Sequence, residues 1–127
     1  MRLLAVLLLL AQPALSQDMA EAPGGMLRVL DKLGGEVADL DMARGQTATM
    51  GRLTLLLDSC RYPADDPASD AMAHLTISDS VAASPVFSGW MVASSPALSA
   101  LDHPRYDVWV LRCDYPEAPP PEPVEGE

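Results

Sequence analysis

The sequence predicts an all-β domain, a small antiparallel β-sandwich or barrel of six to seven short strands with one short helical turn. Two observations lead to this fold class. Apolar and polar residues alternate with period two along several stretches, as in strands with one buried face. Turn-forming residues separate these stretches about every eight to twelve residues, a spacing typical of sandwiches and barrels.

In the N-terminal half, strands are expected before and after the pair Gly34-Gly35. Two glycines between apolar runs indicate a hairpin, because both tolerate positive φ. The pair Arg44-Gly45 predicts the next turn, and Gly51 separates the two strands that follow. The strands expected here are 26–32, 36–42, 47–50 and 52–60.

In the C-terminal half, residues 71–78 give the clearest alternation of the chain, after a polar, proline-rich loop at 61–69. Further strands are expected at 86–93 and 106–113. Between them, Ser94-Ser95-Pro96 is suited to cap and open one or two helical turns that run to Leu101. His103-Pro104 would end that helix, since a residue before proline avoids helical geometry.

The N-terminus has the pattern of a secretory signal peptide over residues 1–16. Arg2 precedes an unbroken apolar run from Leu3 to Ala11, and small residues then lead to an expected cleavage after Ser16. The run is too short to cross a bilayer, which needs about 20 residues, and no cysteine follows it for lipidation. The alternative is a buried core helix. We expect an exported protein without a stable transmembrane anchor.

The remaining chain divides into three parts: a polar leader at 17–23, the β domain at 24–113, and an acidic, proline-rich tail at 114–127. The tail has too few apolar residues to offset its ordering entropy, so we expect it to be disordered. It is either a solubilising terminus or a proline-rich ligand for a partner.

Composition excludes several functions. With 18 acidic and 8 basic residues the formal charge is −10, which disfavours nucleic acid as a partner because phosphate affinity comes largely from Lys and Arg. Two histidines and two cysteines cannot form a four-ligand zinc site of the usual spacing, and no cofactor is indicated. Asp65, Asp66 and Asp70 miss the spacing of a calcium loop, so no metal site is predicted.

The two cysteines, Cys60 and Cys113, each close a predicted strand and are expected to form a structural disulfide. A redox pair or a metal-binding thiol pair is the alternative. Neither cysteine belongs to a C-x-x-C motif, and no nearby histidine supports metal ligation.

The densest group of unusual residues, 86–113, carries a family resemblance. The segments VFSGWM, ASSPALSALDHP and YDVWVLRC, with Gly51-Arg52-Leu53 and Cys60-Arg61-Tyr62, resemble the domain of unknown function 2155 family. The resemblance covers roughly 25–113. It implies a small exported alphaproteobacterial protein, and therefore a periplasmic location, and it supplies no catalytic residues.

The connection from Ser94 to Asp107 is the place where binding groups are expected. It is longer than two neighbouring strands require, and long ordered connections on rigid scaffolds often carry binding residues. The candidate contacts are His103, Arg105 and Tyr106. The alternative is that this connection only covers the core through Leu98 and Leu101.

The tryptophans Trp90 and Trp109 could stack a sugar or present a binding patch, and Trp90 joins the candidate binding residues. Strand parity leaves either face open for each of them, and packing in the core is the favoured interpretation.

A nucleophilic triad of Ser94 or Ser95 with His103 and Asp107 has the right residue types. Yet the serines are better explained as a helix cap, and no G-x-S-x-G elbow is present. The sequence therefore favours a non-catalytic binding or accessory protein of the cell envelope, with an envelope protein or a glycan as partner. The alternative is a small periplasmic hydrolase that uses Ser95 and His103.

Overall fold

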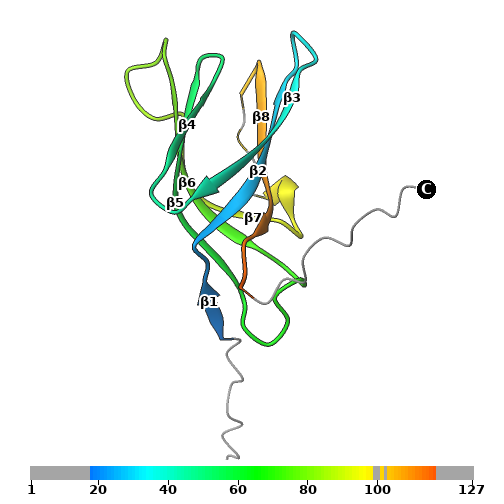
Figure 1. Ribbon diagram of the computed structural model, residues 1–127. Coiled ribbons are helices and arrows are strands. Elements are labelled where there is room, and N and C mark those ends of the chain that lie inside the picture. The colour runs from blue at the N-terminus through cyan, green and yellow to red at the C-terminus, as the bar shows by residue number, and fades with distance from the viewer. Residues whose placement is uncertain (1–17, 99–100, 102, 117–127) are drawn as a thin grey trace, which may run out of the picture.

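The computed structural model describes residues 18–98, 101 and 103–116, which form two antiparallel sheets packed face to face (Figure 1). The predicted all-β class is confirmed, and the two separate sheets make the domain a sandwich rather than a barrel. The elements are β1 (Met19–Glu21), β2 (Gly24–Asp31), β3 (Val37–Ala43), β4 (Thr47–Met50), β5 (Leu53–Pro63), β6 (Met72–Asp79), β7 (Phe87–Val92), the 3-10 turn η1 (Pro96–Leu98) and β8 (Tyr106–Cys113).

The larger sheet is built around β5. One edge of β5 pairs with β6, which in turn pairs with β7. Its other edge holds two short strands, β4 beside Leu53–Leu56 and β1 beside Arg61–Pro63. The smaller sheet has the order β3-β2-β8, so its central strand pairs with a strand from the far end of the domain.

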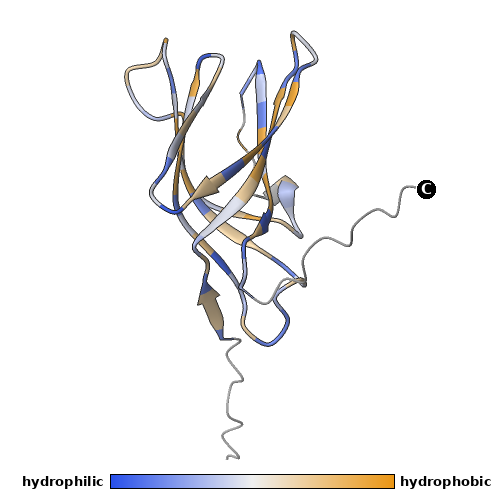
Figure 2. Ribbon diagram, in the orientation of Figure 1, coloured by the Kyte–Doolittle hydropathy of each residue, from blue (hydrophilic) through white to orange (hydrophobic). Residues whose placement is uncertain are grey.

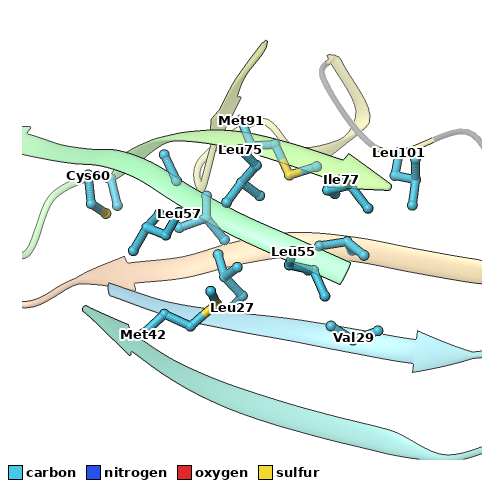
Figure 3. Packing of buried hydrophobic residues seen from close by; sticks show 14 of the residues in the cluster. Leu27, Val29, Met42, Leu55, Leu57, Cys60, Leu75, Ile77, Met91 and Leu101 are labelled. Carbon is cyan, nitrogen blue, oxygen red and sulfur yellow. The ribbon is translucent and has the colours of Figure 1, made fainter. Parts of the chain in front are cut away.

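The core lies between the sheets and follows from the alternation of side chains. Along β5, Leu53, Leu55 and Leu57 are fully buried, while the residues between them face outward. Figure 3 shows Leu55 and Leu57 among side chains from β2, β6 and β7, and hydrophobic residues occur along strands of both sheets (Figure 2). Each fully buried leucine or valine stabilises the fold by about 1.5–3 kcal/mol. The inward residues from the other strands include Leu27, Val29, Leu75, Ile77, Met91, Val108 and Val110.

The predicted disulfide between Cys60 and Cys113 is present and joins the two sheets, from β5 to β8. The two Cα atoms are 5.7 Å apart. Gly25 lies against this bond: a Cβ there would approach Cys60 Sγ to 2.8 Å and the Arg112 carbonyl oxygen to 2.9 Å. Glycine at this position therefore allows the disulfide and β2 to pack together.

The domain begins earlier than the sequence predicts. Within the expected polar leader, Met19–Glu21 forms β1, and Ala22 is buried with its N–H donated to the Cys60 carbonyl oxygen at 2.7 Å. An edge strand is held by backbone hydrogen bonds, which need no apolar side chains and leave little mark in composition. The signal peptide and its cleavage after Ser16 lie outside the described residues.

The domain also continues past its expected end. Asp114 donates its backbone N–H to the Gly24 carbonyl oxygen at 2.8 Å, and the Tyr115 ring packs 5.7 Å from that of Tyr62. These contacts place the first residues of the expected tail in the fold, while 117–127 lie outside the described residues.

The expected helical turn is present as η1, and its predicted continuation includes residues 99–100, which the structure does not describe. Within the described part of the chain, no helix has the length and apolar content needed to cross a bilayer.

Candidate functional site

The four predicted binding residues do not share one surface. His103, Arg105 and Tyr106 lie together at the start of β8, whereas Trp90 lies on β7 and contacts different residues. The four residues therefore belong to two separate parts of the surface and core.

His103 is buried and supports the fold from inside. Its Nδ1 accepts the backbone N–H groups of Arg105 at 3.0 Å and Tyr106 at 3.2 Å, which assigns the ring proton to Nε2. Nε2 lies 2.9 Å from Asp79 Oδ2 and donates to it. The expectation that His103 is a surface contact is wrong, because its side chain is only 7% exposed and both nitrogens are engaged.

Asp79 is the buried carboxylate that holds this group together. Besides His103, it accepts hydrogen bonds from Arg52 Nη2 at 3.0 Å and from the Val81 N–H at 3.1 Å. The hydrogen bond from His103, with those from Val81 and Arg52, outweighs desolvation and holds the pKa of Asp79 below its ordinary value. Asp79 thus stays ionised and ties β6 to the connection before β8.

Tyr106 and Arg105 fasten the same connection to other turns. Tyr106 is buried. Its hydroxyl accepts the backbone N–H of Arg52, which lies in the turn between β4 and β5, at 3.1 Å. Arg105 donates to both oxygens of Asp31, at 3.0 and 3.3 Å, and its hydrogen bond lowers the pKa of Asp31 to about 2. Since Tyr106 is enclosed, it is not the surface contact that the sequence predicts. Leu101, at 2% exposed, covers the core as the alternative interpretation expects, and the Leu98 side chain lies outside the described part.

The predicted hydrolase residues are not assembled into a catalytic arrangement. Neither nitrogen of His103 is free to take a proton from Ser95, because both are already hydrogen-bonded. Asp107 pairs with Lys32 at 3.4 Å instead of orienting the histidine. Ser94 donates its hydroxyl to Asp70 at 2.8 Å. The structure therefore does not support the hydrolase alternative.

Within the described residues, no three His, Cys, Asp or Glu side chains are grouped to hold an ion. Asp70, one of the residues considered for calcium, accepts hydrogen bonds from Ser94 and from the Ala71 N–H.

Trp90 lies on the outer face of the larger sheet, so the favoured prediction of core packing is wrong for this residue. Its neighbour Met91 points inward and is buried. Trp90 stands directly opposite His74 on β6, with ring centroids 5.1 Å apart and planes at 81°. The Arg61 guanidinium carbon lies 5.1 Å from the centroid of the indole, in a cation–π contact.

A carboxylate extends this group across the sheet. Asp58 Oδ2 lies 2.9 Å from His74 Nδ1 and accepts the Thr76 hydroxyl at 2.8 Å. Asp58 is placed by a β-bulge: Leu57 pairs with Leu75 and Ser59 with His74, which leaves Asp58 without a partner. A bulge redirects side chains, and here it brings the carboxylate beside His74. We call Asp58, Arg61, His74, Thr76 and Trp90 the tryptophan cluster.

Sequence reasoning missed most of this cluster. The alternation over 71–78 does place His74 and Thr76 on one polar face, and that signal was available. Asp58 could not be placed, because the bulge has no mark in the sequence. Arg61 fell in an expected loop, although β5 extends through it.

Trp109 is also outside the core, on the outer face of the smaller sheet. It pairs in register with Arg28, which in turn makes a two-bonded ion pair with Asp39 at 2.7 and 2.9 Å. Core packing was the favoured prediction for Trp109 as well, and its inward neighbours Val108 and Val110 show why it is wrong.

The tryptophan cluster offers an aromatic surface, a cation and a hydrogen-bonded His–Asp pair on one partly exposed face. Its side chains are about one-third exposed for His74 (30%) and Asp58 (34%), so a ligand can reach them. Such a group can stack, donate and accept hydrogen bonds, and pair with charge.

The fold and this surface define a small disulfide-linked β-sandwich that presents a mixed aromatic and ionic face. The chain belongs to the family described as "Uncharacterized protein conserved in bacteria (DUF2155)", which matches residues 25–113. It is 26% identical over 101 residues to an uncharacterised protein of Rickettsia prowazekii, covering 77% of this chain. The chain spans 65% of the length of that relative. No solved structure matches it.

Proposed function

We propose that this protein is an exported, non-catalytic binding or accessory module of the cell envelope and that its tryptophan cluster binds an envelope protein. The observation that carries the proposal is Trp90, held on the outer face between Arg61 and His74. The inward faces of β5, β6 and β7 already supply the core, so packing does not require this arrangement.

The residue types favour a protein partner. Tryptophan and arginine are enriched among the residues that dominate binding energy at protein interfaces. Arg61 already covers the Trp90 ring, so a sugar stacked on that face would have to displace the guanidinium. A protein surface can instead pack against the indole edge and pair a carboxylate with Arg61.

Site-specific photo-crosslinking in the producing bacterium tests this proposal. A photoreactive phenylalanine derivative replaces Ser88, an exposed residue that is opposite Thr76 on the outer face. The matched control places the same group at Val37, which is 58% exposed on the smaller sheet. We expect a protein adduct of defined mass from position 88 and none from position 37.

The adduct must depend on the cluster. Trp90→Ala combined with Arg61→Ala should abolish it while the melting temperature stays within a few degrees of the parent, because both side chains lie outside the core. Equal adducts at both positions, or an adduct that survives the double substitution, would contradict the proposal. Binding of the purified protein to isolated cell-wall glycan, lost on Trp90→Ala, would show that the partner is a glycan instead.

Export has its own test. Mass spectrometry of protein from the native envelope should show an N-terminus at Gln17, because the small residues before it fit signal cleavage after Ser16. A chain that retains Met1 would refute export by this signal.

A further inference from the structure

A cleft lies at the other end of the fold from His103, where the two sheets meet beside the disulfide. It has a volume of about 310 Å³. Its walls come from the loop before β6, the end of β7 and the last residues of β8. Small-molecule sites occupy about 300–1,000 Å³, so this cleft has room for a small ligand only.

The cleft is lined by residues of opposite charge from different sheets. Asp70 immediately precedes β6 in the larger sheet, and Arg112 belongs to β8 in the smaller one. Ala71, Ala93 and Leu111 supply apolar surface between them. A site with one carboxylate, one guanidinium and an apolar wall matches a molecule that carries an ammonium group, a carboxylate and a short apolar side chain.

Asp70 is held in place and has capacity for another donor. Its Oδ1 accepts the N–H groups of Ala71 at 2.8 Å and Ser94 at 3.0 Å, while Oδ2, among the described residues, accepts only the Ser94 hydroxyl at 2.8 Å. An ionised carboxylate can accept about four hydrogen bonds. Although desolvation raises it, the hydrogen bonds from Ser94 and Ala71 bring the pKa of Asp70 below its ordinary value, so the group is charged at neutral pH.

Arg112 is exposed, and its positive charge partly offsets the rise that burial causes in the pKa of the neighbouring Asp114 carboxyl. Arg28, Arg44, Arg52 and Arg105 each make an ion pair, and Arg61 covers Trp90. Within residues 18–98, 101 and 103–116, Arg112 makes neither kind of contact. A guanidinium with unused donors is suited to a carboxylate, which it can bind with two parallel hydrogen bonds.

The disulfide keeps the two walls of the cleft in fixed positions. Arg112 directly precedes Cys113, whose Sγ lies 3.3 Å from the Arg61 carbonyl oxygen and 3.9 Å from that of Met72. The end of β8 is therefore fastened to β5 and β6, close to where Asp70 enters the sheet. A site held in this way loses little conformational entropy on binding.

We propose that this cleft binds a small zwitterion of amino-acid to dipeptide size, with its carboxylate on Arg112 and its ammonium group on Asp70. The side chain of the ligand lies over Ala71, Ala93 and Leu111. This site is separate from the tryptophan cluster and does not depend on the function proposed for it.

An NMR titration of the ¹⁵N-labelled protein with its disulfide intact tests the proposal. The probe is the dipeptide L-alanyl-L-leucine, with a dissociation constant expected at about 1 mM or below. Its binding should move the amide signals of Ala71, Ala93 and Ser94. N-acetyl-alanyl-leucine, which lacks the ammonium group, and alanyl-leucinamide, which lacks the carboxylate, should each bind at least about tenfold more weakly.

Two variants assign the charges. Arg112→Gln should weaken the dipeptide at least about tenfold yet leave the already weak leucinamide unchanged, since that probe has no carboxylate to lose. Asp70→Asn should weaken the dipeptide and leave the N-acetyl form unchanged. Arg28→Gln, on the outer face of the smaller sheet, is the control and should not alter binding.

Three results would overturn the proposal: no signal changes with the dipeptide, equal affinity for blocked and unblocked probes, or full affinity in Arg112→Gln. Since Asp70 also holds Ser94, a folding defect in Asp70→Asn is checked by its melting temperature. The Arg112→Gln arm then decides by itself, because that side chain lies at the surface.

Discussion

Replacing Gly51 by alanine tests how the turn between β4 and β5 is tied to the smaller sheet. Gly51 has a φ of +57°, in the left-handed region, where an L side chain costs about 1–2 kcal/mol. A Cβ there would also collide with the Tyr106 hydroxyl and lie 3.3 Å from the ring carbon Cζ. Overpacking of this kind costs about 1–3 kcal/mol, so Gly51→Ala should lower the free energy of unfolding by about 2–5 kcal/mol.

The clash can be separated from the backbone strain by a second substitution. Tyr106→Phe removes the hydroxyl and leaves the Arg52 N–H without its acceptor, which by itself costs about 1–3 kcal/mol. In that background the alanine at position 51 no longer meets the hydroxyl. Gly51→Ala should then cost less, close to the backbone strain of about 1–2 kcal/mol, because only the 3.3 Å approach to the ring carbon Cζ remains.

The assay is urea unfolding of the four proteins with the disulfide intact, followed by far-UV circular dichroism. Gly35→Ala is the matched control, because Gly35 has a φ of +74° and open space around its Cβ position. It should show the strain cost alone. If the costs of Gly51→Ala and Tyr106→Phe add to within about 0.5 kcal/mol, the hydroxyl does not restrict position 51 and the reasoning is refuted.

Two further predictions concern the disulfide and the loss of stability at low pH. Cys60→Ser with Cys113→Ser opens a loop with a sequence separation of 53 and should cost about 4 kcal/mol of unfolding free energy, measured by the same urea assay; an unchanged midpoint would contradict it. The pKa of Asp31 is lowered to about 2 by Arg105, so the stability from its charge is complete above pH of about 4 and is lost as the pH falls toward 2. In Asp31→Asn the free energy of unfolding should fall less between about pH 4 and pH 2 than in the parent. The same pH dependence in parent and variant would contradict this prediction.

The strands that could be predicted are those whose alternation reports one buried face. Residues 71–78 and 106–113 correspond to β6 and β8 to within a residue at each end. β1 could not be predicted, because a three-residue edge strand held by backbone hydrogen bonds has no apolar requirement. The choice between sandwich and barrel likewise depends on strand pairing, which a single sequence does not contain.

The site was harder to predict because the alternation of residues along a strand does not say which of its two faces points into the core. Along β7 one face carries Phe87 and Met91 and the other carries Trp90 and Val92, so both are apolar. Only the packing of β7 against the core decides that Met91 is inside. His103 misled for a different reason: its place in a long connection suggested a binding surface, yet its ring is buried and hydrogen-bonded to Asp79.

The pairing of β2 with β8 sets the order in which this domain can be completed. A ribosome makes β4, β5, β6 and β7 in succession, and each new strand finds its neighbour already made. β2 emerges among the first strands but must wait for β8, the last, with Leu27 and Val29 uncovered on one side until then. Contacts between such distant segments form slowly, and an uncovered strand is prone to aggregate. The smaller sheet therefore cannot be completed until the last strand of the domain has been made, since β2 has no partner on that edge before then.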